Sequence, residues 1–166
     1  MTDNKSKSCW IFDIDGTMAD GRHRQHLVKQ KPKNWPAYKK LAYDDAVYVP
    51  VVRTLLALYQ SGNKIFICSG RSEDEREITN KWLLDKCHIV THIPDNHNSH
   101  LEFHMRQKND HREDSIIKRE ILHNIIRARG FEPMAAFDDR NRVVQMWRSE
   151  GIHVFHVDQT SVSEDF

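Results

Sequence analysis

Short apolar runs alternate along this chain with segments of helical periodicity. Each run is a few residues long and ends in polar or turn-forming residues, as buried strands do. The intervening segments place apolar side chains three or four residues apart, which predicts amphipathic helices. This alternation favours an α/β fold with a parallel sheet. The predicted strands are Cys9–Asp13, Lys64–Cys68, His88–Thr91, Met134–Phe137 and Ile152–Val157.

The four predicted helices also carry recognisable end signals. Ser72 with Glu75 forms a capping-box pattern that predicts a helix start. Gly62, Gly130 and Gly151 follow periodic segments and are typical of helix ends. The periodic apolar positions are Val52, Leu55, Leu56 and Tyr59; Ile78 and Trp82; Ile117, Ile121 and Ile125; and Val143, Val144 and Trp147.

Residues 21–43 and residues 92–111 fit this alternation poorly. The first segment carries seven lysines or arginines and no acid, although the whole chain has a net charge of only +1. Such a segment favours an anionic ligand, and a solvated helical face is the alternative. Trp35 and Tyr38 lie among its lysines, where they could stack on bases or pack within a cap. The second segment is rich in histidine but shows no paired metal-ligand spacing.

The composition indicates a globular protein, which we expect to form a single domain over residues 1–166. No apolar run approaches the roughly 20 residues of a membrane span. The first residues, "MTDNKSKS", lack the apolar stretch of a secretory signal. Cys9, Cys68 and Cys87 show no paired spacing, which suits a reducing cytoplasm. We therefore expect a cytoplasmic protein without a membrane partner; no pattern indicates an oligomeric state.

Acidic and polar side chains follow three of the predicted strands. Asp13 and Asp15 follow "CWIF", the sequence Ser69-Gly70-Arg71 follows "KIFIC", and Asp138-Asp139-Arg140 follows "MAAF". The carboxyl ends of parallel strands meet at one edge of a sheet, where ligands bind. Four carboxylates gathered there would repel one another unless a cation lies among them. Oxygen ligands of this kind suit Mg²⁺, which is often shared with a substrate phosphate.

Asp114 and Lys118 are four residues apart at the start of a predicted helix. This spacing places both side chains on one helix face. A surface ion pair is the ordinary reading of such a pair. The alternative is that Lys118 supplies positive charge beside the phosphate.

Four motifs in this order resemble those of the haloacid dehalogenase (HAD) superfamily of phosphohydrolases: "DIDGT", "CSGR", a lysine opening a helix, and "FDDR". More narrowly, the chain is similar to the 3′-phosphatase domain of bacteriophage polynucleotide kinase/phosphatases. The supporting stretches are "HRQH", "KPKNW", "TNKWL", "MRQKNDHREDSIIKREI" and "FDDRNRVVQMWRSEGI".

The resemblance covers nearly the whole chain from Trp10 to Val157 and departs in two ways. No G-x-x-x-x-G-K-S/T loop is present, so we expect no kinase half. The stretch Pro94–His100 is also longer than in the bifunctional enzyme. The resemblance implies a three-layer, Rossmann-like HAD fold with a central parallel sheet. It also implies a small cap insertion at 21–49 after the first strand, and a loop or insertion at 92–111.

The resemblance also implies a role for each motif residue. Asp13 would attack phosphorus and form an aspartyl-phosphate, and Asp15 would act as general acid and then general base. Ser69 and Lys118 would hold the phosphoryl oxygens. The implied substrate-binding residues are Arg71 with Gly70, either Arg22 or Arg24, and Asp114, which would position Lys118 or an arginine. The implied Mg²⁺ ligands are Asp13, the backbone carbonyl of Asp15, Asp138, and Asp139 directly or through water.

We therefore expect a Mg²⁺-dependent phosphomonoesterase that removes 3′-phosphates from DNA or RNA ends, as in nucleic-acid repair, in the host cytoplasm if the chain is phage-encoded. A phosphatase of free nucleotides or of another small phosphorylated metabolite is the first alternative, because fold does not fix substrate. A non-enzymatic binding module is the second. The sequence argues against it, because every expected catalytic position is filled.

Overall fold

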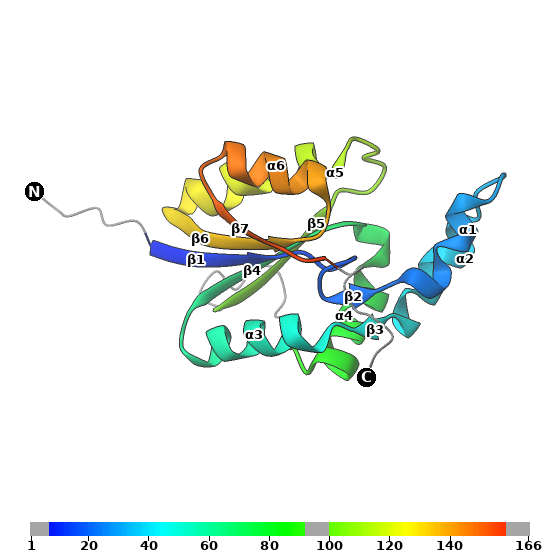
Figure 1. The fold of residues 1–166 in the computed structure, drawn as a ribbon, viewed down its shortest axis with the longest axis horizontal. Coiled ribbons are helices and arrows are strands. Elements are labelled where there is room, and N and C mark those ends of the chain that lie inside the picture. Colours follow the sequence, from blue (N-terminus) through cyan, green and yellow to red (C-terminus); the bar gives the residue numbers. More distant parts are fainter. Residues whose placement is uncertain (1–6, 92–99, 159–166) are drawn as a thin grey trace, which may run out of the picture.

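The computed structural model describes residues 7–91 and 100–158, and it contains a central sheet of five parallel strands (Figure 1). In chain order the strands are Lys7–Phe12 (β1), Lys64–Ser72 (β4), Leu101–Arg106 (β5), Phe131–Asp138 (β6) and His153–His156 (β7). Their order in the sheet is β5-β4-β1-β6-β7, so β1 is central. Because every pairing is parallel, all five carboxyl ends lie at the same edge.

Helices cover both faces of the sheet (Figure 1). Alternate side chains of a strand point to opposite faces, so Ile11 and Phe12 of β1 contribute to two different apolar cores. The helices of the first core are Val49–Gln60 (α3) and Arg76–Cys87 (α4), and those of the second are Asp114–Ile121 (α5) and Asn141–Ser149 (α6). The predicted three-layer α/β fold is confirmed.

The helix-end signals act as the sequence predicts. Ser72 and Glu75 form a reciprocal capping box, which opens a 3-10 turn at Glu73–Glu75 and then α4. Beyond α5 the helix continues through a π-helical turn and a 3-10 turn and ends at Gly130, where φ is +78°. A positive φ costs glycine little because it has no Cβ.

The predicted strand at His88–Thr91 is wrong. His88 adopts a left-handed conformation, with φ of 57°, and ends α4, while Ile89 is buried in the first core. The edge strand is instead β5, so residues 101–106 of the expected 92–111 loop belong to the sheet. Polar residues alternate with the buried Leu101, Phe103 and Met105 in β5, which gives no continuous apolar run. Residues 92–99, which include most of the Pro94–His100 stretch and two histidines of the histidine-rich segment, lie outside the described residues.

Between β1 and α3 the chain forms an excursion beside the carboxyl edge of the sheet (Figure 1). Two short antiparallel strands, Ala19–Asp20 (β2) and Ala46–Val47 (β3), pair at its base. We call residues 21–45, which lie between these strands, the cap. The expected insertion at 21–49 therefore also includes β3 and the start of α3. The cap contains His26–Lys29 (α1), Trp35–Lys40 (α2) and 3-10 turns at Arg22–Arg24 and Leu41–Asp44.

The three cysteines are buried free thiols. Across residues 7–91 and 100–158, none of the helices has the length and apolar character needed to cross a bilayer.

Candidate active site

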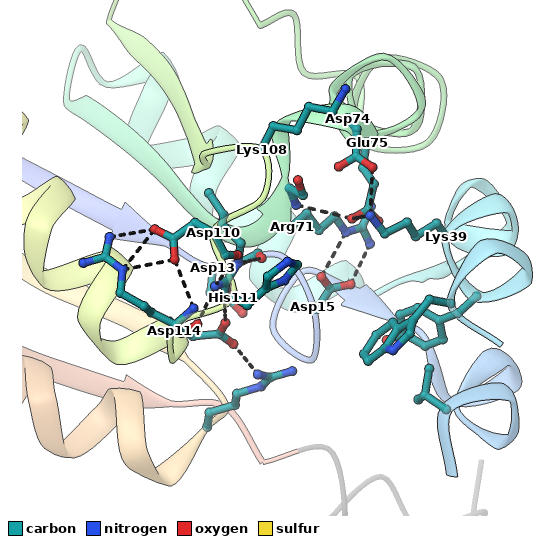
Figure 2. Close-up of a pocket in the computed structure, with 18 of the residues that line it drawn as sticks. Asp13, Asp15, Lys39, Arg71, Asp74, Glu75, Lys108, Asp110, His111 and Asp114 are labelled. Carbon is teal, nitrogen blue, oxygen red and sulfur yellow. Dashed lines mark hydrogen bonds and ion pairs between the residues drawn. The ribbon is translucent and has the colours of Figure 1, made fainter. Parts of the chain in front are cut away.

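Residues from several strand ends converge on one cavity at the carboxyl edge of the sheet. The cavity has a volume of about 770 Å³ and is lined by cap residues on one side and by Arg106 and residues 108–112 on the other. Asp13 and Asp15 enter it from the end of β1, and Arg71 faces Asp15 from β4 (Figure 2). The first helical turns of α5 contribute Asp114 and Lys118. The fold thus brings together residues that are far apart in the sequence.

Three carboxylates and one ammonium group form what we call the carboxyl-edge cluster: Asp13, Lys118, Asp138 and Asp139. Lys118 is buried, and its Nζ donates to Asp13 Oδ1 and Asp138 Oδ2, both at 2.7 Å. Oxygens of the three carboxylates lie within 4.8 Å of one another. The cluster therefore holds more acidic than basic groups away from bulk water.

Burial and the excess of acid shift the protonation of this cluster. Burial raises the pKa of Asp13 well above its usual value; Lys118 opposes this rise, and Asp138 and Asp139 add to it. Burial and the neighbouring Asp138 raise the pKa of Asp139 to about 6. Burial alone would lower the pKa of Lys118, but Asp13 and Asp138 raise it above its ordinary value. Negative charge here is thus incompletely compensated, which is the condition a bound cation relieves.

The donor set fits a hard divalent cation. Asp139 Oδ1 is buried and has no hydrogen-bond partner in the described structure. Carboxylate oxygens gathered at one point are the ligands that Mg²⁺ takes in proteins. The side chain of Asp15 is not part of this group, which leaves only its backbone carbonyl as the expected ligand.

Gly16 allows the loop after β1 to approach Asp139. Its φ is +87°, and a Cβ at this position would lie 2.0 Å from Asp139 Oδ2. Both the backbone conformation and the lack of space therefore require glycine. The next residue, Thr17, is buried, and its Oγ1 donates to Asp13 Oδ2 at 3.4 Å.

Two arginines hold the carboxylate of Asp15. Arg71 donates from Nε to Oδ2 at 2.9 Å and from Nη2 to Oδ1 at 2.6 Å, and Arg24 Nη2 donates to Oδ1 at 2.8 Å. Burial alone would raise the pKa of Asp15, but Arg71 and Arg24 hold it well below its usual range. Asp13 and Asp15 therefore have opposite electrostatic environments although they are two residues apart.

The structure distinguishes the two candidate arginines of the cap. Arg24 is buried, lines the cavity and contacts Asp15. Arg22 is exposed and pairs with Asp20 at 2.6 Å, outside the cavity lining. Only Arg24 is thus placed to meet a ligand in the cavity.

Asp45 was not recognised from the sequence. Its side chain is fully buried and accepts from Arg24 Nε and Nη2, both at 2.6 Å, and from Arg71 Nη2 at 2.8 Å. Its backbone carbonyl accepts from Trp82 Nε1 at 2.8 Å, which ties this end of the cap to α4. Asp45 therefore orients both guanidinium groups. The sequence feature that could have pointed to Asp45 is its place as an acidic residue just after the basic segment 21–43.

Ser69 and Gly70 lie where β4 pairs irregularly with β5. Ser69 is fully buried, and its Oγ accepts from the backbone N–H of Arg71 at 3.1 Å. Gly70 lines the cavity, and a Cβ there would lie 2.8 Å from Asp114 Cγ. The small residues of "CSGR" thus let the strand approach α5 closely.

Asp114 contacts arginines rather than Lys118. Its two carboxylate oxygens accept from Arg106 of β5 and from Arg140, which precedes α6. Of the two expected roles, the structure thus supports the positioning of an arginine. Arg106 was not predicted as a site residue, and Arg140 was expected at this edge of the sheet but was given no role.

Comparison with known proteins agrees with this geometry. Residues 7–162 match the family described as the polynucleotide kinase PNKP phosphatase domain. Two solved structures of a Pnkp1/Rnl/Hen1 complex, one described as an RNA repair complex, contain a similar chain. The TM-scores are 0.71 and 0.70, with 30% and 31% identity over 95% and 93% of this chain. This chain spans only 44% and 47% of those chains.

A class C acid phosphatase from Bacillus anthracis shares the fold. Its TM-score is 0.59, with 16% identity over 92% of this chain and 67% of that chain. The family match over residues 7–162, together with the aspartates at the end of β1, identifies the protein as a HAD-type phosphatase that belongs to the family of PNKP phosphatase domains.

Proposed function

We propose that this protein is a Mg²⁺-dependent phosphomonoesterase that removes the 3′-phosphate from DNA or RNA ends through an aspartyl-phosphate. The observation that carries the proposal is the environment of Asp13. It lies at the end of the central strand, between the ammonium of Lys118 and two further carboxylates, inside a cavity bounded by a basic cap.

Asp13, Asp138, Asp139 and the backbone carbonyl of Asp15 would hold the metal ion. When bound, Mg²⁺ supplies positive charge that polarises the phosphoryl group and offsets the repulsion among the carboxylates.

The protein's own residues then have separate tasks. An oxygen of Asp13 forms a bond to phosphorus while the bond from phosphorus to the leaving O3′ breaks. Lys118 and Ser69 hold the phosphoryl oxygens. Lys118 already donates to Asp13, so its charge lies where negative charge develops. Water then hydrolyses the aspartyl-phosphate and releases inorganic phosphate.

Asp15 would protonate the leaving oxygen and afterwards accept a proton from the attacking water. In the structure its carboxylate is held ionised by Arg24 and Arg71. A phosphate dianion competes for both guanidinium groups, which raises the pKa of Asp15 when substrate binds. The arginines thereby link phosphate binding to the proton that the leaving group needs.

Two features favour a nucleic-acid end over a small metabolite. The cap segment is strongly basic, and the cavity is large enough for a nucleotide. In addition, the similar Pnkp1 chains belong to a complex described as an RNA repair complex. A cavity of this size has room for one strand end, which suits cleavage of a terminal phosphate monoester.

A substrate panel with Mg²⁺ and with chelator tests the proposal. We expect phosphate release from 3′-phosphorylated DNA or RNA oligonucleotides, little release from 5′-phosphorylated ones, and none with chelator. Asp13→Asn serves as the inactive control. If 3′-mononucleotides are cleaved rapidly while the oligonucleotides remain uncleaved, the result would instead favour a phosphatase of free nucleotides.

A further inference from the structure

We propose that Trp35 of the cap stacks on the base of the terminal nucleotide, so that the enzyme acts on 3′-ends whose last base is unpaired. This inference rests on the proposed function, because it concerns the leaving nucleoside of that reaction. It assigns to the cap a base-binding site separate from the phosphate site at β1 and β4.

Trp35 is exposed in a way that the tryptophans of the cores are not. Its exposed fraction is 48%, whereas Trp82 and Trp147 are fully buried. It nevertheless lines the cavity that contains Asp13 and Asp15. A large aromatic side chain in the wall of a ligand cavity offers apolar area that a ligand can cover.

The local structure holds this indole in place. Trp35 is the first residue of α2, which Asn34 caps by accepting from the Ala37 N–H at 3.1 Å. The ring meets Tyr38 in a T-shaped contact, with centroids 5.7 Å apart. A T-shaped contact covers at most one face of the indole, and Lys33 Nζ also lies over the ring, but 48% of the side chain stays exposed, so part of the indole remains open to a ligand. The indole is therefore braced but not enclosed.

A series of contacts connects this ring to the reacting groups. Asp15 accepts from Arg24, and the Arg24 guanidinium lies 4.1 Å from the Tyr38 ring centroid, which in turn meets Trp35. In the proposed reaction Asp15 contacts the leaving O3′. The nucleoside attached to that oxygen thus extends from Asp15 past Arg24 and Tyr38. Its base then meets Trp35.

The charge around Trp35 suits the rest of a nucleic-acid strand. Lys33 Nζ lies 5.7 Å from the indole centroid, and the exposed Lys29 lines the same cavity. Lysines beside an aromatic platform can meet the backbone phosphates of a strand whose base stacks on the ring. A free phosphorylated metabolite without a base would use neither feature.

Stacking on Trp35 requires a base that is not already stacked and paired. The last base of a blunt duplex must unpair before it reaches the ring, which costs free energy. A single-stranded or overhanging 3′-end incurs no such cost. We therefore expect a lower KM for unpaired 3′-phosphate ends than for blunt ones.

The test compares Trp35→Ala with Trp35→Phe on a single-stranded 3′-phosphorylated oligonucleotide and on the same oligonucleotide with an abasic terminal residue. We expect Trp35→Ala to raise KM for the normal end about 10-fold with little change in kcat, because base–aromatic stacking is lost. Trp35→Phe should recover much of this loss. On the abasic end, wild type and Trp35→Ala should have nearly equal KM.

Tyr59→Ala is the matched control, because Tyr59 is an exposed aromatic of α3 that does not line the cavity. Circular dichroism of each variant checks that it is folded. If wild type and Trp35→Ala hydrolyse the normal oligonucleotide with the same KM, the inference is overturned while the proposed function stands. The same holds if Trp35→Ala raises KM equally on normal and abasic ends. A wild-type enzyme inert toward every 3′-phosphorylated oligonucleotide would overturn the proposed function and this inference with it.

Discussion

The two edges of the sheet each carry a cluster of charged residues, and the clusters are built in opposite ways. At the amino edge, Lys64, Glu102 and Arg129 form what we call the amino-edge cluster. Glu102 accepts from Lys64 and, at 2.7 and 2.9 Å, from Arg129 Nη1 and Nη2. One carboxylate there meets at least two cations. In the carboxyl-edge cluster, three carboxylates share one ammonium.

The protonation of the two clusters reflects this difference. Burial would raise the pKa of Glu102, but hydrogen bonds from His104, Arg129 and Lys64 hold it well below its usual value. At the carboxyl edge, the pKa values of Asp13 and Asp139 are raised instead. The amino-edge cluster is thus complete within the protein and stabilises the fold. The carboxyl-edge cluster keeps an excess of negative charge, which in the proposed function a cation would offset.

The largest effect should come from Asp13→Asn. We expect this variant to lose at least ~10⁴-fold in kcat, because an amide cannot serve as the nucleophile. Its free energy of unfolding should not fall, since one of three mutually repelling carboxylates is removed. Activity assays and urea unfolding measure both quantities. Retained turnover in Asp13→Asn would show that another group attacks phosphorus.

Lys118→Ala should have the next largest effect. We expect kcat to fall by about 10²–10³-fold, because the positive charge beside the transferred phosphoryl group is lost. Steady-state kinetics on a 3′-phosphorylated oligonucleotide measures the loss. The exposed Lys81 of α4 provides the control, and Lys81→Ala should behave as wild type. Equal kcat in Lys118→Ala and wild type would contradict the proposed role.

Metal binding at the carboxyl-edge cluster should measurably stabilise the folded protein. At a Mg²⁺ concentration of about 100 Kd, we expect the free energy of unfolding to rise by about 2.7 kcal/mol. Urea unfolding with Mg²⁺ and with chelator measures this rise. In Asp139→Asn the rise should occur only at higher Mg²⁺ concentration, because one ligand charge is lost. An identical Mg²⁺ dependence in the two proteins would exclude Asp139 from the site.

Glu102→Gln should affect stability without affecting catalysis. We expect the free energy of unfolding at neutral pH to fall by about 2 kcal/mol, because the charged partner of Lys64 and Arg129 is lost. Activity per folded molecule should not change. Glu132→Gln is the control, because Glu132 pairs with Arg127 at the surface and such pairs contribute at most about 1 kcal/mol.

The same variant has a defined pH signature. The folded-state pKa of Glu102 is depressed, so its stabilisation is present above the unfolded pKa of about 4.3 and is lost as pH falls toward the folded value. The difference in stability between wild type and Glu102→Gln should therefore shrink below about pH 4. A difference that stays constant from pH 7 to pH 3 would show that Glu102 does not act through its charge.

Local sequence patterns predicted most of the fold. The strands at β1, β4, β6 and β7 and the capping box at Ser72 all follow from short-range rules. The error at His88–Thr91 arose because a short apolar run can also be the end of a helix and the loop after it, with a side chain such as Ile89 buried in the core. Strand β5 was missed because an edge strand with polar residues at alternate positions resembles a loop.

In the candidate site, too, some residues were predicted from the sequence and others were not. Asp13, Asp138 and Asp139 were predicted from their positions after strands, and Lys118 was predicted from the family resemblance; the structure brings the four residues together. The partners that orient the arginines were not predicted. Asp45, for example, reaches Arg71 across 26 residues of sequence, and no local pattern encodes that contact.

The sequence by itself determined the layered α/β architecture, the family and the group of acidic residues at the strand ends, because periodicity and motif spacing are local properties. Only the tertiary structure decided that Arg24 rather than Arg22 faces the cavity, that Asp114 pairs with arginines, and that Asp45 supports Asp15 indirectly. Those outcomes depend on which side chains become buried against one another, and burial is set by the packing of the cap and helices on the finished sheet.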